Sequence, residues 1–394
     1  MSNVETRDYH DSLLFKKIYG YIAAGSIGNS MGELMEGYTV EERQKYWGWI
    51  DYLPPVHKIV GTRYGSERPQ PSVNDRASNP FDTGLGHPPI GHEQFRVPGT
   101  TEDGEERFRI LATAIIDKGG RIDIWDLARA WKNLVTPDKF GWQLGSQDQR
   151  IYYSILAGVN PWDVGRYASW PGLYGTIKMI GAVGVVNACY PEQAAQDGME
   201  LAHLKDVRGV PGNYAVEVAG AHCAGVAEAL RPNATIDSVR NTAMKYLSPT
   251  PLKEYQSVQE LGEKCGEDPE KFGKEMQAKY DNRQVSNAVE IFSAAHALLK
   301  MSNADPRKAI VYTVNAGRDT DCRAHTAGSL AGALSTIDAV PMEWVKTVDD
   351  AMSVNEHTTS NRTSLETTEG LYRAMKNNIE RMRRVINDVD SYGF

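Results

Sequence analysis

The sequence predicts an all-α protein whose residues 1–394 form a single domain. From Glu105 onward, apolar side chains recur at helical spacing in one segment after another. No convincing run of alternating apolar and polar residues predicts a sheet, and no fixed-period repeat or linker requires a second domain. Of the 394 residues, 41% are hydrophobic, which is enough to fill a substantial core.

The first expected helix covers residues 13–35 and is rich in small side chains. Leu14, Ile18 and Ile22 recur at helical spacing, with glycine, alanine and serine at many positions after them. Each glycine costs a helix about 1 kcal/mol relative to alanine, so these glycines indicate tight packing or a functional constraint. We expect a central, buried helix that another backbone approaches closely.

Residues 38–98 are rich in proline and are interleaved with aromatic residues. Disordered linkers are poor in aromatic residues, so this segment is expected to be an ordered insertion packed on the domain. It would serve as a lid over a site, or as a structural cover or oligomer contact. Trp47 and Trp49 within it suit stacking on a base or sugar as well as ordinary packing.

The rest of the chain is expected to be helical. A run of small residues over 326–333 predicts one close-packed helix. The other expected helices cover residues 105–118, 123–135, 148–158, 173–188, 192–204, 214–230, 236–246, 252–279, 285–300, 307–314, 342–354 and 366–389.

Two acidic clusters stand directly before two of these helices. Asp319 and Asp321 precede the small-residue helix, and Thr101, Glu102 and Asp103 precede the helix over 105–118. One interpretation is helix capping, because carboxylates and hydroxyls bind the free N–H groups of a helix start. The other is a cation site, because carboxylate and hydroxyl oxygens are the ligands of hard cations such as magnesium. Together, the clusters could form a multi-carboxylate site between two helix N-termini.

Two details of these clusters stay open. If the second cluster only caps its helix, Thr100 or Thr101 is the expected N-cap. Glu36 comes at the end of the first helix, just before the proline-rich segment, where it could overhang a cleft. A lone glutamate at that place is more often a solvated helix-end residue.

Three motifs of the chain resemble, in the same order, those of the ADP-ribosylglycohydrolase family. The family's Gly-Asp-x-x-Gly-x-x-x-Glu segment is matched from Gly28 to Glu36, and its Thr-Asp-Asp-Thr segment by Thr101-Glu102-Asp103-Gly104 after a Pro-Gly pair. The family's Gly-x-Asp-Thr-Asp-Thr segment is matched by Gly317-Arg318-Asp319-Thr320-Asp321-Cys322. The resemblance implies a single large orthogonal helical bundle with a binuclear magnesium site, in some members manganese.

Carried over position by position, the resemblance assigns roles to individual residues. Thr101, Glu102 and Asp103 would hold metal from one side, and Asp319 and Asp321 from the other. Glu36, Asp103 and Asp321 would be the catalytic residues, with Glu36 assisting proton transfer. Two cations would orient a ribose diol and lower the pKa of a water.

Four positions depart from the family's motifs. Asn29 stands in place of an aspartate, Glu102 is one methylene longer than the usual aspartate, and Gly104 and Cys322 replace threonines. A thiol is a poor partner for magnesium, so one or two ions, or the softer manganese, remain alternatives. Because these changes fall at ligand positions, they suggest a substrate or reaction other than removal of ADP-ribose from a protein.

Other side chains capable of catalysis have weaker signals in the sequence. His203 and His222 could face a common pocket, but isolated histidines are more often packed or solvated than catalytic. Cys322 is a weak candidate nucleophile beside Arg323 and His325, since neighbours on a helix need not face one another.

Composition limits the classes of partner. The net charge of −8 argues against nucleic acid and anionic membranes, and no apolar stretch is long enough to span a membrane. The 4 cysteines show no zinc-like spacing, and the N-terminus lacks a signal-peptide pattern, so a cytoplasmic location is expected.

The sequence therefore predicts a metal-dependent hydrolase that cleaves an N-glycosidic, ribosyl-type bond in a nucleoside-like metabolite or an ADP-ribosylated substrate. A small molecule is favoured over a protein substrate, because the proline-rich segment could close over a small ligand. The alternatives are a metal-assisted lyase or isomerase acting on a sugar-like metabolite, and a non-catalytic binding or structural descendant. The oligomeric state is left open.

Overall fold

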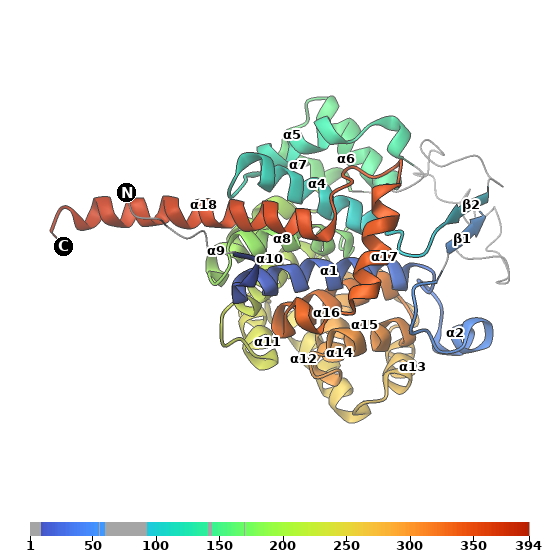
Figure 1. Ribbon diagram of the computed structural model, residues 1–394. Coiled ribbons are helices and arrows are strands. Elements are labelled where there is room, and N and C mark those ends of the chain that lie inside the picture. Colours follow the sequence, from blue (N-terminus) through green and yellow to red (C-terminus); the bar gives the residue numbers. More distant parts are fainter. Residues whose placement is uncertain (1–8, 55, 60–92, 141–143, 169, 394) are drawn as a thin grey trace.

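The computed structural model describes residues 9–54, 56–59, 93–140, 144–168 and 170–393, and in these the protein is a helical bundle (Figure 1). The expected all-α fold is confirmed. The helices are α1 (Leu13–Glu33), α2 (Val40–Trp47), α4 (Asp103–Lys118), α5 (Ile124–Leu134), α6 (Ser146–Leu156), α7 (Pro161–Val164), α8 (Gly175–Val186), α9 (Pro191–Ala202), α10 (Ala215–Ala229), α11 (Ile236–Met244), α12 (Pro249–Cys265), α13 (Pro269–Lys279), α14 (Ala288–Met301), α15 (Pro306–Asn315), α16 (Thr320–Ser335), α17 (Met342–Ser353) and α18 (Ser364–Asp390), with short 3-10 turns at Tyr9–Asp11, Pro137–Lys139, Gly165–Tyr167 and Ile337–Ala339.

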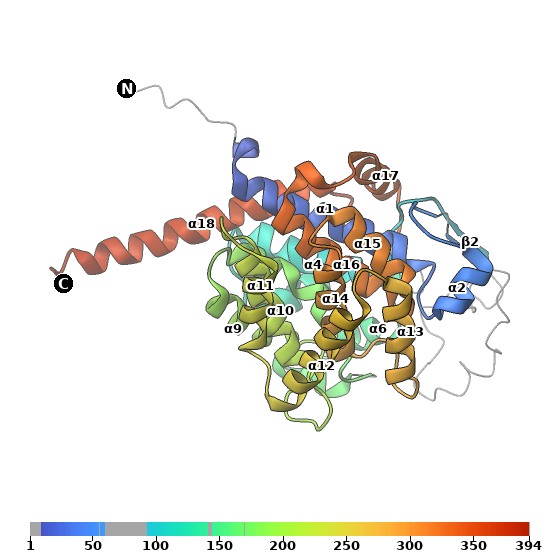
Figure 2. The same ribbon diagram turned by 90° about the horizontal axis from the view of Figure 1, so that it is seen from below.

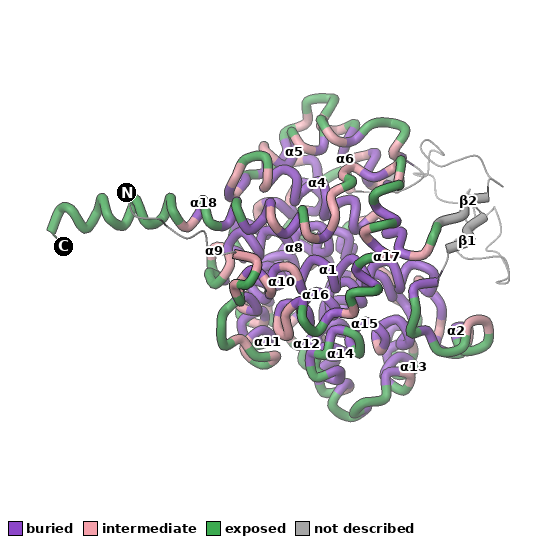
Figure 3. Tube along the Cα trace, viewed as in Figure 1, coloured by how far each residue is buried: buried purple, intermediate pink, exposed green. Residues whose placement is uncertain are grey.

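Helices α1 and α16 form the centre of the bundle, where almost every residue of both is buried (Figure 3). Their backbones touch at paired small residues. A side chain at Gly20 would overlap the backbone of Gly332, and one at Gly28 would overlap the backbone of Ala324. The expectation of a central small-residue helix beside another backbone is confirmed, and the contact fixes the position of the α16 N-terminus.

Two predictions of local structure were wrong. Residues 252–279 are not one helix, because Gly266 has a positive φ of 64° after α12 and Asp268 caps α13, whose first residue is Pro269. The chain also has a short antiparallel strand pair, β1 (Val56–Ile59) and β2 (Glu93–Arg96), with Val56 opposite Arg96. Both strands are too short for an alternating pattern to predict them.

The expected insertion over residues 38–98 is partly described. It begins with α2, whose N-cap Thr39 accepts a hydrogen bond from the Glu42 amide, and it includes both strands. Figures 1 and 2 show α2 and the strand pair at the same end of the bundle. Residues 60–92 lie outside the described residues, so a lid at this place stays a prediction.

Helix α18 begins against the bundle and then leaves it (Figures 1 and 2). Leu371 and Met375 are buried, whereas residues 381–393 are all exposed. None of the described helices is both long enough and apolar enough to cross a membrane. The 4 cysteines are unpaired, with Cys189 exposed and the others buried.

Candidate metal and active site

The loop before α16 is held by its backbone and by a buried ion cluster. Gly317 and Arg318 both have positive φ values, 74° and 64°, and the Arg318 amide donates to the Tyr38 carbonyl at 2.8 Å. The Arg318 and Arg323 guanidiniums both bind Glu290, at 2.6 and 2.7 Å, and all three side chains are almost fully buried. This clamp fixes the loop that carries Asp319.

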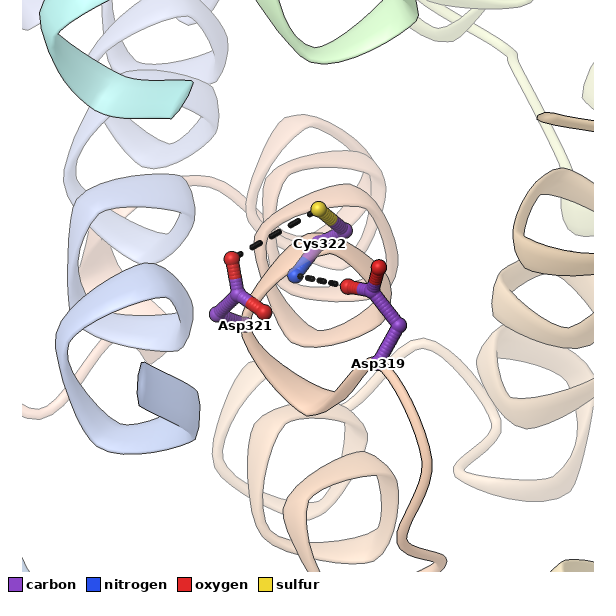
Figure 4. Close-up of side chains that lie close together, drawn as sticks. All are labelled: Asp319, Asp321 and Cys322. Carbon is purple, nitrogen blue, oxygen red and sulfur yellow. Dashed lines mark hydrogen bonds between the residues drawn. The ribbon is translucent and has the colours of Figure 1, made fainter. Parts of the chain in front are cut away.

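Asp319 and Asp321 face each other at the first turn of α16 (Figure 4). Asp319 is the N-cap: its Oδ1 accepts a hydrogen bond from the Cys322 amide at 3.2 Å. Each carboxylate has one oxygen, Asp319 Oδ2 and Asp321 Oδ1, that is buried without a hydrogen-bond partner among the described residues. Capping therefore accounts for Asp319 Oδ1, but it does not account for the two buried oxygens without partners, Asp319 Oδ2 and Asp321 Oδ1.

The start of α4 supplies the second acidic cluster. The N-cap is Glu102, whose carboxylate accepts from the Gly104 amide at 2.9 Å, so the expectation of Thr100 or Thr101 at that position was wrong. The Asn29 side chain accepts from the Glu102 amide at 2.9 Å and donates to the Glu102 carboxylate. Thr101 Oγ1 is thereby left free of the cap, buried and without a partner in the described part of the chain.

Lys178 of α8 joins the two clusters, and the sequence analysis missed it. Its ammonium donates to Asp321 Oδ2 at 2.7 Å and to Glu102 Oε1, and lies 3.8 Å from Cys322 Sγ. The side chain is fully buried. Burial alone would lower the pKa of Lys178, but Asp321, Cys322 and Glu102 raise it well above its usual value. The group is a fixed positive charge.

Asp103 is engaged differently from its neighbours. Both its oxygens accept from Arg107, at 3.0 and 2.5 Å, and the same guanidinium binds the buried Asp148. The Asp103 side chain is 36% exposed, whereas that of Asp321 is 3% exposed. Asp103 thus faces the solvent side of the cluster and shares one arginine with Asp148, and burial raises the pKa of Asp103 well above its usual value.

Glu36 lies near enough to the cluster to affect it. Helix α1 ends at Glu33, and Glu36 is half-buried in the turn that follows. Burial raises the pKa of Asp321 well above its usual value, and the charges of Asp319, Glu102 and Glu36 raise it further, against the effect of Lys178. Mutual repulsion of this kind is what a bound cation relieves.

The other candidates have ordinary surroundings. His203 packs against Trp162 with ring centres 5.4 Å apart, whereas the buried His222 lies 3.4 Å from the Tyr21 hydroxyl, so the two histidines have different neighbours. Trp49 is partly covered by Arg43, whose guanidinium lies 5.8 Å from the ring.

The idea of Cys322 as a nucleophile is not supported. Burial, with Asp319 and Asp321 beside it, raises the pKa of the thiol well above its usual value. The thiol lies 3.5 Å from Asp321 Oδ2, as a neutral donor to that carboxylate. Arg323 is bound to Glu290, and His325 Nδ1 lies 3.3 Å from Glu105, so neither is available to activate it.

The residues present fit one hard cation better than two. Asp319, Asp321 and Cys322 lie close enough together to share an ion, and three buried oxygens of the two acidic clusters lack partners in the described chain: Thr101 Oγ1, Asp319 Oδ2 and Asp321 Oδ1. Oxygen donors of this type suit magnesium or manganese. The remaining expected ligands are occupied, Glu102 by Lys178 and Asp103 by Arg107.

Comparison with known proteins agrees with this architecture. The sequence profile described as ADP-ribosylglycohydrolase matches residues 10–380. Among 47 matching chains of solved structures, one described as an "ADP-ribosylglycohydrolase-related protein complex" has a TM-score of 0.56 and 15% identity, and the match covers 92% of this chain and 99% of that one. Its identity is low enough that it supports the fold alone. No curated protein matches the chain. The profile spans nearly all of the sequence, and the chain therefore belongs to the ADP-ribosylglycohydrolase family.

Proposed function

We propose that the protein is a metal-dependent glycohydrolase that cleaves an N-glycosidic bond to a ribose-type sugar in a small nucleoside-like compound. Membership of a glycohydrolase family supports hydrolysis of a glycosidic bond. The observation that carries the metal-dependent part is the set of three buried oxygens without partners, from Thr101, Asp319 and Asp321, at the N-termini of two helices.

Each side chain has a role that follows from its surroundings. Thr101, Asp319 and Asp321 would hold one magnesium or manganese ion, which supplies a water of lowered pKa and an anchor for sugar hydroxyls. Asp103 is partly exposed and binds Arg107, while burial and the nearby Glu102 raise its pKa well above its usual value, so it suits exchanging a proton with water or holding a sugar hydroxyl. Glu36 is half-buried at the same cluster and suits proton transfer to or from the leaving group.

Exposure supports an approach from one side. Asp319 and Lys178 are fully buried, Glu102 is 14% exposed and Asp103 is 36% exposed. A substrate would therefore meet Asp103 and Glu102 first, with the cation beneath them. A small molecule is favoured over a protein as the substrate, because the charged groups of the cluster are mostly covered in the described part of the chain.

The test is product analysis with metal-stripped and metal-loaded protein. Free sugar should appear from ribosylated small molecules only when magnesium or manganese is added, and mass spectrometry should detect one added water per bond cleaved. Asp319→Asn with Asp321→Asn should abolish turnover. Asp305→Asn is the matched control, because Asp305 is also an aspartate N-cap but belongs to α15.

Two other functions have distinct outcomes in the same assay. A dehydrated or isomerised sugar without added water would indicate a metal-assisted lyase or isomerase. The ammonium of Lys178 among the expected ligands favours a second candidate, a binding protein descended from the family. Saturable binding of the ribosylated compound without any turnover, with or without metal, would establish that candidate and reject hydrolysis.

A further inference from the structure

Lys178 enters the acidic cluster from a helix that contributes no other ionic group to it. Helix α8 is apolar, all twelve of its residues are buried, and Lys178 is its only charged residue. A buried ammonium is costly unless it is paired, and this one has Glu102 and Asp321 as partners. The side chain thus bridges the starts of α4 and α16, between which the family's cations are expected.

The surroundings of Lys178 leave room for it. A Cβ at Gly104 would lie 2.6 Å from Lys178 Cε and 2.7 Å from its Nζ, so a side chain at residue 104 would force the lysine to shift. The glycine stands where the family motif has a threonine. Asn29 donates to the Glu102 carboxylate, whereas an aspartate at that position would repel it.

The charges also leave a place for one further ion. If Glu102, Asp319 and Asp321 are all ionised, their three negative charges exceed the single charge of Lys178 by two, which one divalent cation balances. The two oxygens of Asp321 have different surroundings. Oδ2 accepts a hydrogen bond from Lys178, whereas Oδ1 is buried without a partner in the described residues and could bind the ion. Asp103 lies outside this balance, because it shares Arg107 with Asp148.

We propose that the Lys178 ammonium takes the place of one of two cations, so that this protein binds a single divalent ion through Thr101, Asp319 and Asp321. The inference rests on the proposed function only for the identity of the site, and it concerns metal stoichiometry rather than turnover. Lys178 acts as a positioning residue that holds Glu102 and Asp321 in the places that a second ion would otherwise impose.

Titration calorimetry of metal-stripped protein with manganese tests this directly. The parent should bind one ion, and Lys178→Ala should bind two, because Glu102 and Asp321 Oδ2 become free. Paramagnetic resonance should detect a coupled pair of manganese ions in the variant and an isolated ion in the parent. Lys205→Ala is the matched control, because Lys205 is another buried lysine, bound to Gln147 instead, and its loss should leave one ion.

The outcomes separate this inference from the proposed function. Two ions in the parent, none in the parent, or one ion in a folded Lys178→Ala protein would each overturn it. If that variant does not fold, Lys178→Gln keeps a hydrogen-bond donor without the charge on a side chain one methylene shorter, and it should still bind the second ion. One ion in the parent and two in the variant, with no hydrolysis by either, would support the inference and reject the proposed function.

A second inference comes from the exposed end of α18. Met382, Val385 and Val389 follow one another at spacings of three and four residues, and Val385 and Val389 are 61% and 47% exposed. These three residues have the spacing of a coiled-coil seam over little more than one heptad, with Ile386 also exposed beside them, on a helix segment that extends away from the bundle (Figure 1). Single exposed apolar residues are common, but a continuous seam is not.

Charge indicates what covers this seam. Basic residues, Arg381, Arg383 and Arg384, are followed by acidic ones, Asp388 and Asp390. An antiparallel pair of such helices places the basic half of each against the acidic half of the other, which a parallel pair does not. We infer that the exposed part of α18 pairs with α18 of a second copy of this chain in antiparallel orientation.

Sedimentation equilibrium of the full chain tests the pairing. The parent should be a dimer at micromolar concentrations, and Val385→Glu with Val389→Glu should be monomeric with unchanged circular dichroism of the bundle. Asn387→Glu is the control, since Asn387 lies off the seam and its change should leave the dimer intact. A monomeric parent at 100-fold higher concentration, or a dimer that survives the double change, would overturn the inference.

Discussion

Removal of the Glu290 carboxylate tests how the loop before α16 is held. Glu290 is fully buried and binds two buried arginines, Arg318 and Arg323, at 2.6 and 2.7 Å. Breaking a buried ion pair by removing one partner costs about 3–5 kcal/mol, because the other charge stays buried without compensation. With two arginines affected, Glu290→Gln should lower the free energy of unfolding by at least about 3 kcal/mol, a large share of the usual 5–15 kcal/mol.

The assay is urea unfolding followed by circular dichroism, with a matched control. Glu254→Gln removes the partner of Arg283, which is 36% exposed, so that change should cost about 1 kcal/mol or less. Manganese affinity should fall only in Glu290→Gln, because Arg318 and the neighbouring Gly317 set the position of Asp319. Equal losses of stability in the two variants, or unchanged manganese affinity in Glu290→Gln, would refute the idea that Glu290 holds the loop before α16 in place.

Two further predictions concern buried titratable groups. Burial and the nearby His325 lower the pKa of His222 to about 3, so between pH 6.5 and 3 the unfolded chain binds a proton that the folded protein does not. The contribution of His222 to the free energy of unfolding should therefore be fully present above pH 6.5 and fall by up to about 1.4 kcal/mol per pH unit below it. In His222→Leu, the melting temperature should depend less on pH between 6.5 and 3. Iodoacetamide should modify the exposed Cys189 of native protein and spare Cys322, whose thiol is buried with a raised pKa; peptide mapping that finds Cys322 alkylated first would contradict this.

The central packing of the fold was predictable because it depends on residue size. Glycine at positions 20, 28 and 332 allows α1 and α16 to touch at their backbones, and the small-residue runs in the sequence predicted such contact. The break between α12 and α13 also has a signal in the sequence, because Asp268 followed by Pro269 is typical of a helix start. Apolar periodicity does not detect this signal. The strand pair β1 and β2 had no local signal, because its formation depends on segments far apart in the chain.

The candidate site was predictable in part, because some of its residues are identified by their type and spacing in the sequence. Thr101, Glu102, Asp319 and Asp321 carry a motif and stand at helix starts, so their type and spacing identified them, although their roles as ligands remain a prediction. Lys178 belongs to no motif. Its only signal was a lone charge in the apolar run of α8, where burial demands a partner that the sequence does not name.

Of the four departures from the family's motifs, three lie against Lys178 and the fourth, Asn29, binds one of those three. Glu102 binds Lys178 directly, Asn29 binds Glu102, and the Cys322 thiol lies by the same Asp321 oxygen that Lys178 contacts. Gly104 provides the space for the lysine side chain. If one ammonium explains all four changes, then restoring one residue while Lys178 remains should be harmful rather than corrective.

Gly104→Ala, made with and without Lys178→Ala, puts that explanation to the test. In the parent, the new Cβ would displace a buried, paired ammonium and should cost about 1–3 kcal/mol of unfolding free energy. In the Lys178→Ala background the space is empty, and alanine should instead stabilise α4 by up to about 1 kcal/mol relative to glycine. Gly225→Ala, whose Cβ would meet only ordinary contacts at 3.6 Å or more, should have the same effect in both backgrounds. The coupling between positions 104 and 178 would then exceed the few tenths of a kcal/mol expected for independent sites. Additive effects at these two positions would mean that the glycine serves the backbone and that the four departures have separate causes.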